Sequence, residues 1–164
     1  MKKQLTIIAA ITLTVISINT KSIAGETSLA AYLTYWDGGE NDGYDGSGGG
    51  LKLRQKFAGL FSADIRIGYL DFSEKDQDIS SVPVETVLMI GLPLMLEPYA
   101  GVGAGYCFVD SDRPEFEDGT EIFGVIGVQL NLMVVGAFAE VRYTDSDTDL
   151  MDGISGNLGL MIKW

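Results

Sequence analysis

The sequence ends in the stretch "GISGNLGLMIKW", Gly153 to Trp164, in which large apolar side chains recur at every second position from Leu158 onward. The positions between them hold glycine, methionine and lysine. Successive side chains of a β-strand point to opposite faces, so a period of two is typical of a strand with two unlike faces. The stretch therefore predicts a β-strand with one apolar face.

The same alternation recurs upstream, in runs that are separated by turn residues and show no helical periodicity. A tilted strand needs about 9 to 11 residues to cross a bilayer, which is close to the length of each run. One parity of every run is apolar and carries no charge. The sequence therefore predicts an all-β chain, an eight-stranded antiparallel up-and-down transmembrane β-barrel. Its strands are expected at about 27–36, 48–57, 60–70, 81–91, 97–109, 121–131, 134–144 and 154–164.

The opposite parity of the runs carries glycine and both signs of charge in nearly equal number. An eight-stranded barrel has a narrow interior that needs small residues beside large ones, and unpaired buried charges are costly. Both features favour a lumen on this side of the wall and lipid on the apolar side. We expect a lumen charge network formed by Lys52, Arg54, Asp64, Arg66, Glu85, Glu121, Glu140 and Arg142.

Alternation alone also fits a soluble secreted ligand-binding barrel, in which the apolar parity would line an internal pocket. The connections favour the membrane alternative. Those after even-numbered runs, "FAGL", "LPLML" and "NLMV", are short and uncharged, whereas those after odd-numbered runs are long and hold most of the acidic residues. Outer-membrane barrels have short periplasmic turns and longer outer loops. We therefore expect four acidic extracellular loops and periplasmic termini.

The N-terminal stretch "MKKQLTIIAAITLTVISINTKSIAG" has two lysines, an apolar run and small residues before a cleavage position after Ala24. This pattern is typical of a secretory signal peptide, and the apolar run is too short for a membrane-spanning helix. The expected domains are a signal peptide at 1–24 and an outer-membrane barrel at 25–164. The net charge of the chain is −12. An acidic chain of this kind is not expected to bind nucleic acid.

The connection "DSDTDLMDG", Asp145 to Gly153, places carboxylates at alternate positions, as calcium loops do. It is not an EF-hand, because Leu150 stands where that motif needs glycine and Gly156 where it needs glutamate. Two interpretations stay open. The stretch is either a solvated loop or a site for a divalent cation, with the ligands Asp145, Asp147 and Asp149.

The signal peptide, the eight strands and the closing aromatic residue together resemble the small outer-membrane barrels of the OmpA/OmpX type, over 25–164. The resemblance implies a place in the outer membrane, contact with its lipid and lipopolysaccharide, and recognition by the barrel assembly machinery. The implied assembly signal is the alternating end of the last strand, Leu158, Leu160, Ile162 and Trp164. Such a resemblance concerns architecture, which identifies a fold better than a function.

Enzymes on this scaffold that act on lipid A rely on a histidine, and the chain contains none. No nucleophile in the sequence stands beside a base. The sequence therefore predicts a non-enzymatic barrel without a cofactor, which has a structural or surface-interaction role at its acidic loops. The alternative is a narrow pore or transporter for small or apolar solutes, because Phe123 and Phe138 share the parity of the lumen charges.

Overall fold

The computed structural model describes residues 25–38, 44–57, 59–74, 77–111, 118–147 and 151–164. The predicted signal peptide at 1–24 lies outside the described residues, and so does Asp149 of the predicted cation site. No helix in the described part of the chain is long and apolar enough to cross a membrane.

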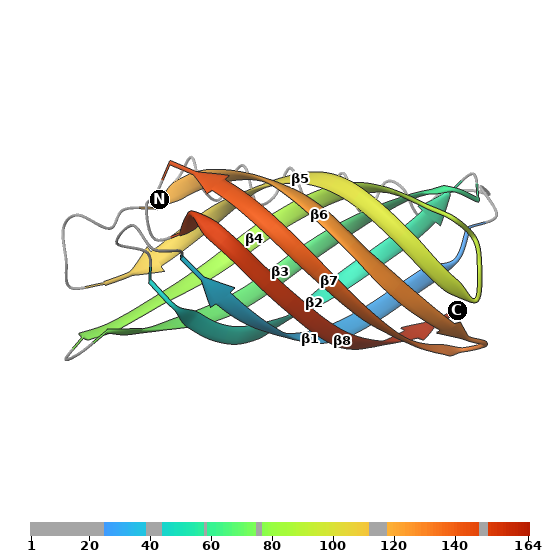
Figure 1. Ribbon diagram of the computed structural model, residues 1–164, viewed down its shortest axis with the longest axis horizontal. Helices are drawn as coiled ribbons and strands as arrows, with labels where there is room; N and C mark the ends of the chain where they lie inside the picture. Colours follow the sequence, from blue (N-terminus) through green and yellow to red (C-terminus); the bar gives the residue numbers. More distant parts are fainter. Residues whose placement is uncertain (1–24, 39–43, 58, 75–76, 112–117, 148–150) are drawn as a thin grey trace.

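Eight strands form a closed barrel in which each strand pairs antiparallel with its neighbours in sequence (Figure 1). The last strand closes the ring by pairing antiparallel with the first. This confirms the predicted eight-stranded antiparallel barrel. The strands are β1 (Thr27–Asp37), β2 (Gly46–Phe57), β3 (Phe61–Glu74), β4 (Gln77–Gly91), β5 (Leu96–Asp110), β6 (Gly119–Leu132), β7 (Val135–Ser146) and β8 (Gly153–Lys163).

The connections divide between the two ends of the barrel. Those after β1, β3, β5 and β7 lie at one end, which we call the loop end. Those after β2, β4 and β6 lie at the other, which we call the turn end, together with the C-terminus (right in Figure 1).

The connection between β3 and β4 is shorter than the sequence predicted. β3 runs to Glu74 and β4 begins at Gln77, with pairs such as Asp71 opposite Ser80 in the stretch that was expected to be a loop. Ladder hydrogen bonds join backbone groups and need no apolar face. Strand pairing therefore continues where the alternation of side chains stops.

The apolar parity of the strands faces outward. Leu33, Ile126 and Leu160 are 73%, 64% and 71% exposed, although each lies in the middle of the wall or close to it. A soluble ligand-binding barrel would hold these side chains inside, so that alternative is wrong. Water poorly tolerates a continuous apolar surface, whereas hydrocarbon stabilises it.

Rings paired with glycines across neighbouring strands fill much of the narrow lumen. Phe138 on β7 lies opposite Gly159 on β8, and Phe123 on β6 lies opposite Gly103 on β5. A Cβ atom added to Gly159 would lie 2.5 Å from Cε1 of Phe138, closer than real contacts allow. Close packing in the lumen therefore requires glycine at these positions.

Candidate functional site

A buried apolar cluster, which we call the cap, closes the lumen near the loop end. Its members come from four strands and from the connection before β8. Solvent reaches hardly any of their surface. Two of them lie in the stretch that the sequence placed in a loop, although they continue the lumen parity of β3 and β4. The cap consists of Trp36, Leu70, Phe72, Ile79, Cys107 and Met151.

Deeper in the lumen, three cations and two carboxylates form a central ion cluster. Arg54 binds Asp64 through two parallel contacts, from Nε to Oδ1 at 2.7 Å and from Nη2 to Oδ2 at 2.9 Å. Arg66 bridges the two carboxylates, with Nη2 2.9 Å from Asp64 Oδ2 and Nη1 2.5 Å from Glu140 Oε1. Lys52 lies 3.3 Å from Glu140 Oε2. Charge-assisted contacts of this kind are strong, and these tie β2 and β3 to β7 across the lumen.

A second cluster surrounds Arg142 on β7. Its guanidinium donates to carboxylate oxygens of Glu85 and Glu121, and its Nε donates to Thr144 Oγ1 at 2.7 Å. The guanidinium carbon lies 3.8 Å from the ring centre of Phe123. Two oxygens, Glu85 Oε2 and Glu121 Oε1, are buried without a hydrogen-bond partner among the described residues. This cluster has one anion in excess, whereas the central cluster has one cation in excess.

All eight predicted lumen charges therefore lie inside the barrel and in ion pairs. Neutral partners that the sequence analysis missed complete the network. The Tyr99 hydroxyl donates to Glu140 Oε2 at 2.7 Å, Asn157 Nδ2 donates to Glu140 Oε1 at 3.1 Å, and Arg54 Nη1 donates to Gln129 Oε1 at 2.6 Å. Their shared lumen parity was the one signal that could have pointed to them.

The charged layers leave little space for solvent. A water-filled channel would expose the side chains along it, yet Asp64 and Val87 are 0% exposed and Arg66 is 2% exposed. A small cavity of about 20 Å³ lies between the cap and the ion clusters, lined in part by Trp36, Arg66 and Glu85. That volume suits about one water molecule.

A third polar group fills the turn end of the lumen. Lys56 Nζ lies 2.6 Å from Glu97 Oε2, and Asn131 Nδ2 donates to the same oxygen at 3.1 Å. Lys163 Nζ donates to Asn131 Oδ1 at 2.9 Å and lies 3.3 Å from Glu26. The lumen is thus apolar beneath the loops and charged beneath the turns.

Solved structures share this architecture, whereas no protein-family model and no curated protein sequence matches the chain. Neisserial surface protein A superposes with a TM-score of 0.66 at 12% identity, over 85% of this chain and 97% of that one. OprG, an outer membrane protein of Pseudomonas aeruginosa, superposes with 0.58 at 15% identity, over 86% and 96%. Ail, the attachment invasion locus protein of Yersinia pestis, superposes with 0.55 at 19% identity, over 85% and 99%.

The chain has the fold of a small outer-membrane β-barrel. Identities this low show the fold alone, so the function of this barrel has to be argued from its own residues.

The residues of the predicted cation site are only partly described. Asp145 is the last outward-facing residue of β7, and Asp147 accepts a hydrogen bond from Thr120 Oγ1. Over the described ranges, no three carboxylate or thiol side chains gather closely enough to hold a metal ion. Asp149 lies outside those ranges, so the cation site stays a prediction.

The residues of the predicted assembly signal form one outward stripe on β8. Leu158, Leu160 and Ile162 are exposed on the outer face, and Trp164 follows at the turn end. Trp164 is held by two backbone hydrogen bonds to Thr27, of 3.0 and 3.1 Å. The stripe is accessible on the finished barrel, and its recognition by assembly machinery stays a prediction.

Proposed function

We propose that this chain is a non-enzymatic, integral outer-membrane barrel that acts through its loop-end surface and conducts no solute. The observation that carries the proposal is the filled lumen. The apolar cap, the ion clusters and the turn-end group lie one after another along the barrel axis. A solute would have to displace buried ion pairs at several levels, and breaking such pairs is costly.

The exposed apolar side chains on the outward face of the strands, which we call the outward belt, support the location in a membrane. We infer that the loop end faces the outside and the turn end faces the periplasm, because outer-membrane barrels place their longer connections outside. Lipid and lipopolysaccharide would then surround the wall. The acidic connections would be the part of the barrel that external molecules meet first.

The charge of the loop end limits its partners. Asp37, Asp71 and Asp145 are among its exposed carboxylates, and most acidic residues of the chain lie in the connections of this end or at the strand ends beside them. Ail has been solved with the heparin analogue sucrose octasulfate, which is an anion. A comparable anion would be repelled by this barrel. We propose divalent cations, lipopolysaccharide bridged by them, or a basic external partner instead.

The carboxylates of the central ion cluster are poor candidates for catalysis. Asp64 and Glu140 are already saturated by arginine, lysine and tyrosine donors, and the chain has no histidine to act as a general base. These contacts favour a structural role for the charges, as ties across the barrel.

Fractionation of the native cells, followed by protease treatment of intact cells, tests the location and the orientation together. We expect the protein in the outer-membrane fraction, with cleavage confined to the loop-end connections. Recovery in a soluble fraction would overturn the membrane assignment, and cleavage at the turn end alone would reverse the orientation.

Planar-bilayer recording of the refolded barrel tests the absence of a pore. We expect no regular conductance steps, because the ion pairs fill the lumen. Uniform steps from purified, folded protein would contradict the proposal and favour the pore alternative.

A further inference from the structure

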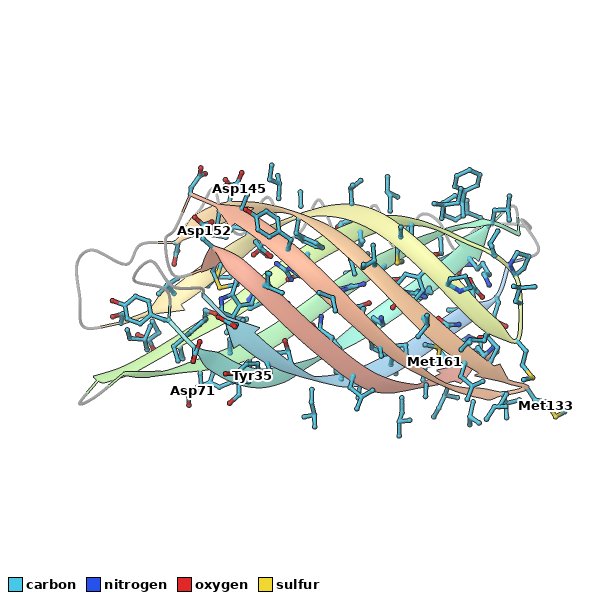
Figure 2. All side chains as sticks on the ribbon, in the orientation of Figure 1. Tyr35, Asp71, Met133, Asp145, Asp152 and Met161 are labelled. Carbon is cyan, nitrogen blue, oxygen red and sulfur yellow. The ribbon has the colours of Figure 1, made fainter. Side chains whose placement is uncertain are left out.

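The three connections at the turn end expose large apolar side chains at their tips. Met133 is 92% exposed and Met95 is 69% exposed, and Figure 2 shows Met133 projecting from the very end of the barrel. A turn that faces water usually carries polar residues or glycine at such positions. We call this set of side chains the turn rim. It consists of Leu60, Leu92, Leu94, Met95, Met133 and Val134.

Each of these connections accepts a backbone hydrogen bond from a neighbouring strand. Gly91 N donates to Leu60 O at 2.8 Å, and Asn131 N donates to Met95 O at 2.8 Å. Lys163 N donates to Val134 O at 2.9 Å. A polar backbone group can leave water only if it finds another partner. The turn rim therefore has carbonyl groups that do not depend on water.

The backbone of Met133 is in the left-handed region, with φ of 49°. Side chains with a Cβ atom rarely adopt this conformation, and glycine and asparagine are the usual residues there. Gly59, in the connection between β2 and β3, takes the same region with φ of 73°. A methionine at this position is unfavourable for the backbone, and in water its exposed side chain gains nothing in return. An apolar environment would compensate by burying it.

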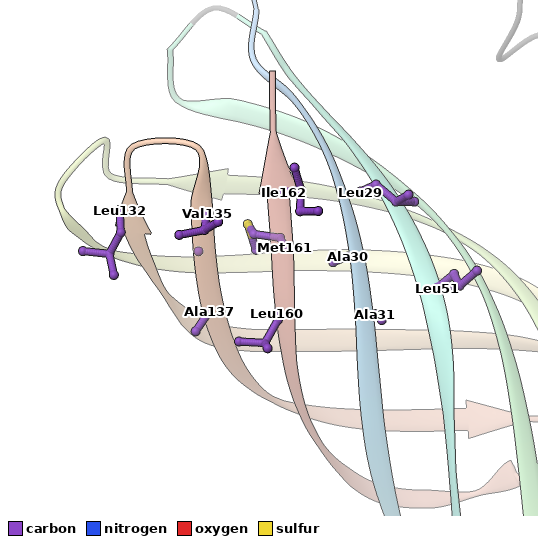
Figure 3. A pocket seen from close by; sticks show the side chains of 11 residues that line it. Leu29, Ala30, Ala31, Leu51, Leu132, Val135, Ala137, Leu160, Met161 and Ile162 are labelled. Atoms are coloured by element: carbon purple, nitrogen blue, oxygen red, sulfur yellow. The ribbon is translucent and has the colours of Figure 1, made fainter.

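An apolar groove continues the turn rim along the outer wall (Figure 3). The groove has a volume of about 570 Å³ and runs from Leu132, beside the connection between β6 and β7, across β7, β8 and β1 to Leu51 on β2. Small residues such as Ala31 and Ala137 lower its floor between larger side chains, and none of its lining residues is charged. The rim and the groove are one apolar surface with the outward belt.

We propose that the turn rim is immersed in the lipid leaflet on its side of the membrane, at the boundary between headgroups and acyl chains, and that an acyl chain of a phospholipid in this leaflet occupies the groove. The inference rests on the proposed membrane location and adds the depth of the turns. Hydrogen-bonded backbone suits this boundary, whereas unpaired backbone would keep the turns in water. The exposed surface of the turn end thus contacts lipid and not a soluble partner.

Spin-label accessibility in phosphatidylcholine vesicles tests the proposal. The single natural thiol, Cys107, is buried, so nitroxides can be attached at M133C, L94C and A137C in the full barrel. I126C, in the middle of the outward belt, and D145C, at the loop end, serve as the lipid and water references. Oxygen partitions into lipid and a nickel chelate stays in water, so their relaxation effects measure depth.

We expect the labels at positions 133 and 94 to be several-fold more accessible to oxygen than to the nickel chelate. Their ratio of oxygen to chelate accessibility should lie between those of positions 126 and 145. The ratio at position 137 should resemble that at position 126. Rim labels as accessible to the chelate as position 145 would overturn the proposal while leaving the membrane location intact. Rim labels accessible to neither reagent would indicate a covering second copy and would also overturn it. Chelate access at position 126 would refute the membrane location itself.

Discussion

The loop end and the turn end of the barrel have opposite distributions of polar and apolar side chains between interior and exterior. At the loop end the interior is the apolar cap, and the exterior carries carboxylates. At the turn end the interior holds the pair Lys56–Glu97 and the buried Lys163, and the exterior is the apolar turn rim. The first arrangement is that of a soluble protein, and the second is that of a protein in lipid. The two ends thus match different surroundings, water at the loop end and, as we propose, lipid at the turn end.

The largest expected effect comes from the interior of the loop end. Replacement of Phe72 by alanine should lower the free energy of unfolding by about 3–5 kcal/mol, because a ring is removed from a sealed core. Phe61 is the matched residue on the exterior of the turn end, at 46% exposure against 0% for Phe72. Phe61→Ala should cost clearly less, since acyl chains can fill its place. Urea titration of both variants in vesicles measures the difference, and equal losses would remove the contrast between the ends.

Next in size is a charge placed on the outer wall. Ile126→Arg should lower stability by about 2–4 kcal/mol, because the side chain lies near the middle of the belt, where arginine must leave water. Asp145→Arg has the same outward parity but lies at the loop end, where we expect about 0–1 kcal/mol. Folding yield and heat-modifiable gel mobility report both. If the two variants fold alike, the outward belt does not meet hydrocarbon.

A smaller difference in stability is expected when a single methyl group is added inside the barrel or on its outer face. Gly103→Ala should cost about 1–3 kcal/mol, because the new methyl group would overlap the ring of Phe123. Gly124 on β6 faces outward, and a Cβ atom there meets nothing within 4 Å. Gly124→Ala should therefore leave the melting temperature unchanged or slightly raised. A drop for Gly124→Ala that matches the one for Gly103→Ala would show that overlap is not the cause.

The smallest expected effect is that of divalent cations at the loop end. Millimolar calcium should raise the melting temperature slightly by relieving repulsion among the carboxylates, and calcium should exceed sodium at equal ionic strength only if the carboxylates converge on a site. The triple change Asp145→Asn, Asp147→Asn, Asp149→Asn tests this connection. Loss of a calcium-specific rise in that variant would establish the site, whereas identical responses to calcium and sodium would leave a solvated loop.

The strands, their faces and the lumen charges could be predicted from the sequence because each is a local property. Parity alone decides which face a residue takes, so Arg54 and Glu140 could be assigned to the lumen without knowledge of their partners. The partners could not be predicted. Arg54 binds Asp64 of the next strand, but Arg66 also reaches Glu140 on β7, across the lumen, and this depends on how the barrel closes.

The cap could not be predicted because its residues break the pattern that identifies the strands. Leu70, Phe72 and Ile79 continue the lumen parity but are apolar. Phe72 and Ile79 lie within the charged stretch "DFSEKDQDI", Asp71 to Ile79, and Leu70 directly precedes it. Met151 also belongs to the cap, but it lies in the connection before β8, where the sequence has no alternating pattern that could place it. The exposed apolar tips of the turn rim were likewise not predicted, although the sequence showed that its connections were uncharged.

The seam between β1 and β8 has a consequence for the newly made chain. Thr27 and Trp164 exchange backbone hydrogen bonds in the finished barrel. The edge of β1 that does not face β2 therefore has no partner until β8 is in place. Any chain that lacks β8 is an open sheet with unpaired edges, and such edges join readily to those of other molecules. The chain is therefore exposed to such association until β8 has paired with β1.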